Sequence, residues 1–169
     1  ISSSCGSFNV FNSTFKNTNS DSAGAILISD TGRSFTIFRS TFTNVTANNR
    51  GGGIYNLNSG NFTVINSTFT NNAVGSDCGG AIYQVSGILT VINSTFNSCG
   101  VPNKGSAIYN LGNAFLIGSS FINSNAIDSG GAIYNSGSVV VTNSSFINIK
   151  AGAFGGAIYN SGSVVVTNS

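Results

Sequence analysis

The chemistry open to this chain is limited by how few of its side chains can ionise or bind a metal. Its 169 residues include four aspartates and six lysines and arginines, whereas glutamate and histidine are absent. Without histidine or glutamate, most general bases, catalytic triads and metal sites of familiar types cannot be assembled. We therefore expect no metal, no cofactor and no enzymatic activity, and the search for reactive groups narrows to the aspartates and the three cysteines.

Three of the four aspartates occupy one position of a recurring pattern, two residues before a corner of small residues. The intervening repeats carry asparagine there, so the column runs Asp21, Asn49, Asp77, Asn103, Asp128. If the repeats stack at about 4.8 Å, successive aspartates lie about 9 to 10 Å apart, at or beyond the upper limit for an inverting glycosidase. Loop hydrogen bonding is the interpretation we favour. A polysaccharide-cleaving pair, Asp77 and Asp128, and a calcium site on this column are the alternatives.

The cysteines and the Asn-x-Ser/Thr sequons both fit an extracellular protein. Cys78 and Cys99 lie in the equivalent loops of successive repeats, so a disulfide between them is predicted, which leaves Cys5 unpaired or bound to a partner outside the chain. An asparagine packed in a turn has little room for a sugar, so Asn44 and Asn61 are the favoured glycosylation sites. The other sequon asparagines are Asn12, Asn66, Asn93 and Asn143.

Composition excludes several classes of partner. The net charge is +2, and the basic residues are scattered, so no basic patch for nucleic acid is expected. No apolar run approaches the roughly 20 residues that a membrane span requires. The sequence begins at Ile1 without a signal-peptide pattern and ends within a repeat, so we expect residues 1–169 to be one repeat domain within a longer array.

The elements that position these residues follow from an internal repeat. Two phrases alternate, one of the type Gly-Gly-Ala-Ile-Tyr and one of the type Asn-Ser-Thr-Phe, with a period of 25 to 28 residues. The fifteen residues GGAIYNSGSVVVTNS occur twice, starting at Gly130 and Gly155. Each period contains three short stretches of strand-forming residues and no helical pattern. This predicts an all-β parallel β-helix of about six coils; a leucine-rich-repeat horseshoe is disfavoured because its leucine pattern is absent.

Stacked coils place equivalent residues above one another, and strand alternation then assigns them to the inside or the outside. One column predicted to face inward consists of Ile26, Ile54, Ile82, Ile108, Ile133 and Ile158. A second consists of Phe15, Phe42, Phe69, Phe96, Phe121 and Phe146. The tyrosines that follow the isoleucines are predicted to face outward as a stripe of Tyr55, Tyr83, Tyr109, Tyr134 and Tyr159. This stripe is interpreted as mutual ring stacking or as a platform for sugar rings.

The repeated phrases also resemble those of known families of surface proteins. The recurring GGAI followed by a phenylalanine phrase resembles the repeat of polymorphic outer-membrane proteins of intracellular bacteria. It is more similar still to the GGAIYN…NSTF repeats of large adhesin-like surface proteins of methanogenic archaea. Only Phe69 and Asn72 fit the bacterial spacing Phe-x-x-Asn, whereas most repeats have Phe-x-Asn, as in Phe15 and Asn17. The resemblance implies a right-handed, single-stranded parallel β-helix at the cell surface.

Three functions remain open from the sequence. The favoured one is a non-enzymatic extracellular stalk, sheath, fibre or adhesin that associates with itself, head to tail or laterally, or with host or cell-surface glycans and proteins. The second is a carbohydrate-binding module that uses the tyrosine stripe. The third is a polysaccharide-cleaving enzyme or tailspike, which would use Asp77 and Asp128.

Overall fold

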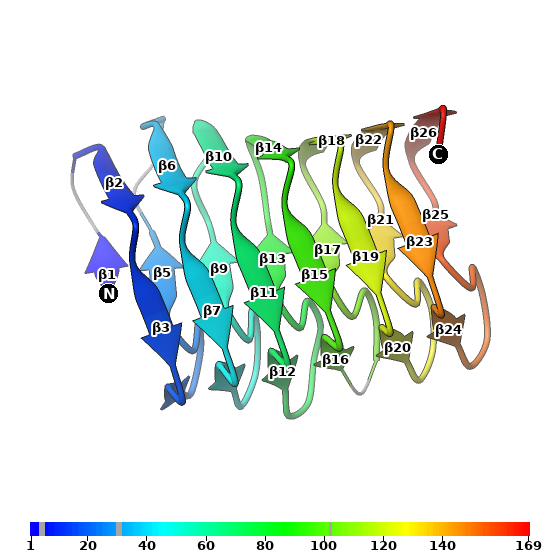
Figure 1. Cartoon of the computed structure of the whole chain (residues 1–169), viewed down its shortest axis with the longest axis horizontal. Coiled ribbons are helices and arrows are strands. Elements are labelled where there is room, and N and C mark those ends of the chain that lie inside the picture. The colour runs from blue at the N-terminus through cyan, green and yellow to red at the C-terminus, as the bar shows by residue number, and fades with distance from the viewer. Residues whose placement is uncertain (4–5, 30–31, 102) are drawn as a thin grey trace.

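Short runs of β-branched and aromatic residues, interrupted by glycine, asparagine or serine, fold into strands of two to five residues. A computed structural model describes residues 1–3, 6–29, 32–101 and 103–169, and these ranges contain no helix, hence none that could cross a membrane. In Figure 1 the near strands run downward and the far strands run back upward as the chain advances from N to C, which makes the path right-handed. The predicted right-handed parallel β-helix of about six coils is confirmed.

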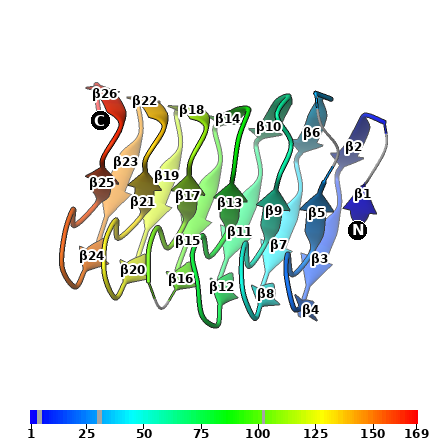
Figure 2. The same cartoon turned by 180° about the vertical axis from the view of Figure 1, so that it is seen from behind.

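Each complete coil contributes one strand to each of four parallel sheets, here called A to D in the order in which the chain meets them (Figures 1 and 2). Sheet A contains β1 (Ser2–Ser3), β5 (Ile26–Ile28), β9 (Ile54–Asn56), β13 (Ile82–Gln84), β17 (Ile108–Asn110), β21 (Ile133–Asn135) and β25 (Ile158–Asn160). Sheet B contains β2 (Phe8–Phe11), β6 (Phe35–Phe38), β10 (Asn61–Ile65), β14 (Ile88–Ile92), β18 (Asn113–Ile117), β22 (Ser138–Thr142) and β26 (Ser163–Thr167).

The remaining two sheets have shorter strands. Sheet C contains β3 (Thr14–Lys16), β7 (Thr41–Thr43), β11 (Thr68–Thr70), β15 (Thr95–Asn97), β19 (Ser120–Ile122) and β23 (Ser145–Ile147). Sheet D contains β4 (Asn19–Ser20), β8 (Thr46–Ala47), β12 (Ala73–Val74), β16 (Gly100–Val101), β20 (Asn125–Ala126) and β24 (Lys150–Ala151). The three strands per coil expected from the sequence are those of sheets A, B and C, and sheet D lies in the polar loop that follows them.

The core is built from columns, because every strand pairs in register with its counterpart one coil away. The phenylalanines of sheet C stack face to face, with ring centroids 4.6 to 5.0 Å apart and ring planes within 11° of parallel. The isoleucines of sheet A are fully buried from Ile26 to Ile133, and Ile158 of the last coil is partly buried. Two inward columns of sheet B complete the same hydrophobic cluster.

Polar ladders close the turns between these sheets. At the turn from sheet B to sheet C, a residue with positive φ, such as Asn66 (50°), precedes a serine. The backbone N–H of each serine donates to the hydroxyl of the serine one coil later, as from Ser67 to Ser94 at 3.1 Å, and that hydroxyl donates to the carbonyl two residues before it. The Asn-Ser pair recurs at this turn because asparagine tolerates the left-handed backbone conformation and serine forms hydrogen bonds between successive coils.

A second polar ladder lies inside the helix at the end of sheet A. Asn110 and Asn135 are fully buried, and the side-chain amide of Asn110 donates to the side-chain oxygen of Asn135 at 2.7 Å and to the backbone carbonyl of Gly112 at 2.7 Å. Asn135 repeats both contacts one coil later with Asn160 and Gly137. Each of these turn carbonyls also accepts from a backbone N–H one coil later, so the amides add a second link between the turn and the stacked side chains.

The corner before sheet A requires glycine for two reasons. Gly79 has φ of +71°, a conformation that side chains rarely adopt. Gly80 lies against the next coil so closely that a Cβ atom would overlap the carbonyl oxygen of Ser106. The Gly-Gly pair thus allows the chain to turn sharply and the next coil to approach.

Candidate interaction surface

The tyrosines of sheet A form one continuous column along the outside of the β-helix. Each ring lies 4.6 to 5.2 Å from the next, centroid to centroid, and the last three rings are parallel within 15°. The column is only half-exposed, and Tyr83 is buried, with 7% of its surface accessible. Burial raises the pKa of Tyr83 to about 12. Tyr109, Tyr134 and Tyr159 cover one another's faces and so offer mainly ring edges and hydroxyls, whereas Tyr55 meets Tyr83 edge to face at 79°.

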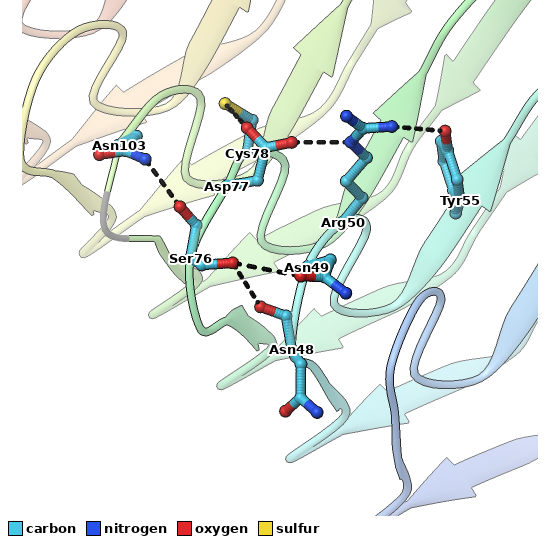
Figure 3. Close-up of polar contacts among 8 residues, drawn as sticks. All are labelled: Asn48, Asn49, Arg50, Tyr55, Ser76, Asp77, Cys78 and Asn103. Atoms are coloured by element: carbon cyan, nitrogen blue, oxygen red, sulfur yellow. Dashed lines mark hydrogen bonds and ion pairs between the residues drawn. The ribbon is translucent and has the colours of Figure 1, made fainter.

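A charged corner borders this column at Arg50 (Figure 3). The Arg50 Nε donates to the carboxylate of Asp77 at 2.7 Å, and its Nη1 donates to the Tyr55 hydroxyl at 3.2 Å. The guanidinium also lies 5.6 Å from the ring centroid of Tyr83. The hydrogen bond that Arg50 donates to Asp77 raises the pKa of Arg50 further, so this group stays charged throughout the useful pH range.

The same arrangement recurs two coils later. Lys104 takes the place of Arg50, since both belong to a row of paired residues that also contains Cys78. The Lys104 ammonium lies 3.9 Å from Asp128 and 4.9 Å from the ring centroid of Tyr134. Both proposed catalytic carboxylates therefore face a cation of the preceding coil, so the alternating column acts as a set of ion pairs between coils.

Nearby amides extend the polar network at this corner. The Asn103 side chain donates to the carbonyl of Ser76 at 2.8 Å, and the Ser76 hydroxyl donates to the carbonyl of Asn48 at 2.9 Å. Within the part of the chain that the structure describes, no three cysteine, histidine or acidic side chains converge as a metal site would require. The exposed groups at this corner are therefore hydrogen-bonding amides and hydroxyls beside one ion pair.

The predicted disulfide between Cys78 and Cys99 is wrong, because both are free thiols in the structure. Cys99 follows sheet C at the inward position that Val45 occupies two coils earlier, and it belongs to the hydrophobic core. Cys78 lies instead at the glycine corner, where its thiol contacts Asp77 at 3.2 Å. Burial raises the pKa of each thiol to about 12. The prediction for Cys5 falls on a residue outside the described ranges.

The sequon asparagines are all exposed, but they differ in their contacts. Asn44 belongs to an external amide ladder: its amide donates to Asn17 at 3.1 Å, and its oxygen accepts from Asn71 at 3.3 Å. This ladder continues at the other end of the helix, where Asn148 donates to Asn123. Asn44 is therefore engaged in a turn ladder of the kind that disfavours a glycan, whereas Asn61 begins a strand of sheet B outside that ladder.

Two shallow hollows mark the loops of sheet D. One, of about 250 Å³, lies between β4, β8 and β12 and is lined by residues such as Thr46, Asn48 and Val74. The other, of about 290 Å³, is lined by asparagines and Lys150. Both are open and lined mainly by neutral groups, unlike the enclosed apolar clefts that are typical of small-molecule sites.

One surface feature was not predicted from the sequence. The last outward position of sheet B holds a large apolar residue in five successive coils, Phe11, Phe38, Ile65, Ile92 and Ile117, here called the outer apolar row. The signal is present in the sequence, because the residue that follows the second inward position of each of these strands is also apolar.

Comparison with known proteins supports the class that this fold and repeat define, which is that of parallel β-helix repeat proteins. Residues 66–84 and 143–161 match the family pattern described as the Chlamydia polymorphic membrane protein repeat. Each match runs from the Asn-Ser turn through sheets C and D and the glycine corner into sheet A. No curated protein and no solved structure shows significant similarity. The chain is thus a parallel β-helix with repeats similar to those of polymorphic membrane proteins.

The first matched segment contains the Phe69 and Asn72 pair that fits Phe-x-x-Asn. Asn72 is fully buried, and its side-chain oxygen accepts from the Val45 N–H at 3.0 Å while its amide donates to the Phe42 carbonyl at 3.2 Å. The asparagine of this spacing therefore links two coils from the inside, which gives the pattern a structural reason independent of any ligand.

Proposed function

We propose that this chain forms part of a non-enzymatic, extracellular β-solenoid that serves as an adhesin, stalk, sheath or fibre at a cell surface. The observation that carries the proposal is the uniformity of the coils. The two copies of GGAIYNSGSVVVTNS adopt the same strands in the same register, β21 with β25 and β22 with β26. A solenoid that repeats an identical coil gains length and surface, and each added coil needs no new packing arrangement.

The similarity to polymorphic membrane protein repeats supports a location at the cell surface. The Phe-x-Asn spacing further supports kinship with the adhesin-like surface proteins of methanogens. The aspartates support the non-enzymatic part of the proposal, because Asp77 and Asp128 each face a cation at 2.7 Å and 3.9 Å. Each carboxylate is thus engaged with a partner within the protein.

Location and adhesion are tested separately. Immunogold labelling of intact cells with antibodies against the chain should decorate the surface, and external protease should remove the label. Beads coated with the purified chain should then bind cells, and soluble chain should compete with that binding. Label found only after permeabilisation would refute the surface location, whereas surface label without bead binding would leave a stalk or sheath and refute adhesion.

A second candidate is glycan binding at the charged corner. The favouring observation is the exposed group of Arg50, Asp77 and the Tyr55 hydroxyl, which joins a cation, an anion and a phenol within hydrogen-bonding distance. Recognition at this group would depend on hydrogen bonds. Saturable binding on a glycan array that falls when Arg50 becomes Ala, and survives when the distant Ile122 becomes Thr, would support this candidate. Binding that the Arg50→Ala change leaves intact would refute it.

A further inference from the structure

The outer face of sheet B exposes more apolar surface than an isolated rod needs. Phe11 is 54% exposed and Ile117 39% exposed, at the two ends of the outer apolar row, and Phe38, Ile65 and Ile92 between them are partly exposed. Phe115, on the neighbouring outward column, is 40% exposed, and Ile88 on the third column is 37% exposed. Single exposed apolar residues are ordinary on protein surfaces, whereas a contiguous row of them marks an interaction surface.

The same face carries no charge. None of the strands of sheet B contains an ionisable residue, and the outward column beside the row holds threonine in three successive coils, at Thr36, Thr63 and Thr90. The nearest cation in sequence, Arg39, follows β6 and rests against the Phe38 ring, 4.8 Å from its centroid. Packing against this face would bury no charge from the strands themselves, and the Arg39 guanidinium beside Phe38 would have to remain at the rim of the contact, where charged groups of protein interfaces lie.

The extent of the face matches what a stable association needs. Seven strands at about 4.8 Å spacing and about 16 Å in length give a surface of about 550 Å². Two such faces in contact bury about 1,100 Å², which passes the threshold of about 1,000 Å² for a specific interface.

We infer that the outer face of sheet B packs against the same face of a second copy of the chain. Periodicity selects this partner: another copy presents apolar side chains at the same spacing, so every coil meets a matching coil. A partner without that spacing would match one or two coils only. A two-fold axis that lies in the plane of the face, parallel to the strands and near Ile92 on the middle strand β14, would pair all seven strands and bring Ile65 of one copy near Ile117 of the other.

This inference is independent of the proposed surface role, because association through sheet B depends only on the fold. It concerns lateral pairing of coils and leaves the ends of the rod free.

The chain itself provides the substitutions for a test. Thr142 and Thr167 already occupy the position of the row in the following coils, so Ile92→Thr and Ile117→Thr retain a β-branched residue that this position accommodates. A matched control exists on sheet C, where Ile122 and Ile147 are outward and the same column holds threonine in earlier coils. The control pair is Ile122→Thr with Ile147→Thr.

Sedimentation velocity over a concentration series measures the association. The unaltered 169-residue chain should form a dimer, and the Ile92→Thr, Ile117→Thr variant should dissociate at about tenfold to hundredfold higher concentration. The control variant should match the unaltered chain. A monomer throughout the series, equal weakening in the control, or a dimer that the sheet B changes leave intact would each overturn the inference.

A spin label gives an independent readout of which face is buried. Cysteine introduced at Thr63, outward on sheet B, should give a short distance between labels in the dimer by pulsed electron paramagnetic resonance. Cysteine at Thr70, outward on sheet C, should give a long one. Both variants carry Cys5→Ser, and the burial of the free thiols of Cys78 and Cys99 restricts labelling to the introduced cysteine. A short distance between labels at position 70, together with a long distance between labels at position 63, would place the interface on sheet C and overturn the inference.

Discussion

Removal of one ring from the phenylalanine stack provides the strongest test of how this fold is held together. Phe69 is fully buried and lies between Phe42, 4.6 Å away with planes 5° apart, and Phe96, 4.8 Å away with planes 3° apart. Phe69→Ala would open a cavity that the rigid coils on either side cannot fill. Burial and cavity terms together cost about 3 to 5 kcal/mol, and the two lost stacking contacts favour the upper half of that range.

Two further variants separate the cost of the lost stacking contacts from the cost of the lost apolar burial. Phe69→Leu keeps an apolar side chain of similar reach but removes both stacking contacts, so it should cost about half as much as the alanine change. Phe154→Ala removes the same ring where it is 65% exposed, and it should cost less than about 0.5 kcal/mol.

Urea unfolding followed by circular dichroism at 25 °C measures these differences, provided that the m-values of the variants agree. A change in m would indicate that the coils on either side of Phe69 unfold separately, as repeat proteins can. The reasoning fails if Phe69→Ala costs less than about 1 kcal/mol or no more than Phe154→Ala, because the stack would then contribute no more than ordinary surface packing.

Three other perturbations have defined outcomes. Asn110→Ala should destabilise the chain by about 1 to 2 kcal/mol in the same assay, since it removes the Asn110 donor of the buried Asn135 side-chain oxygen while the Gly112 carbonyl keeps its backbone donor; a loss near zero would show that the inner ladder is dispensable. Gly80→Ala should cost at least about 2 kcal/mol because its Cβ meets backbone of the next coil, whereas Gly100→Ala, where nothing lies within 4 Å, should cost far less. Raising the pH from 8 to 11 should lower stability: burial raises the pKa of Cys99 and Tyr83 from 9.0 and 10.0 to about 12, so the unfolded chain loses these protons first, and stability present below about pH 9 declines toward pH 12. Flat stability across that interval would contradict the assigned burial.

The architecture could be predicted from the sequence because equivalent positions of every coil carry similar residues. A period of 25 to 28 residues, alternation within each short strand and glycine at each corner together leave one arrangement, in which residues one period apart lie side by side. The same alternation placed the isoleucines and phenylalanines inside. It required no knowledge of distant contacts, because every neighbour of a coil is a near copy of that coil.

The surface could not be predicted to the same degree, because it depends on contacts between coils that the period alone does not specify. Cys99 and Cys78 looked like loop neighbours in sequence, but one faces the core and the other lies at a corner. The alternating pattern of aspartate and asparagine suggested spaced carboxylates, and only the structure showed that Arg50 reaches forward to Asp77 of the next coil.

What the sequence determined by itself is therefore the coil: its length, its turns and the residues that fill it. What the tertiary structure decided is the character of each outer face. Stacking at the strand spacing covers the faces of Tyr109, Tyr134 and Tyr159 and leaves their edges, and it joins five separate residues of sheet B into one apolar row. Whether a side chain points inward depends on the alternation within its own strand. Which outward side chains become neighbours depends on how the coils stack, so the chemistry of each outer face is set only in the assembled β-helix.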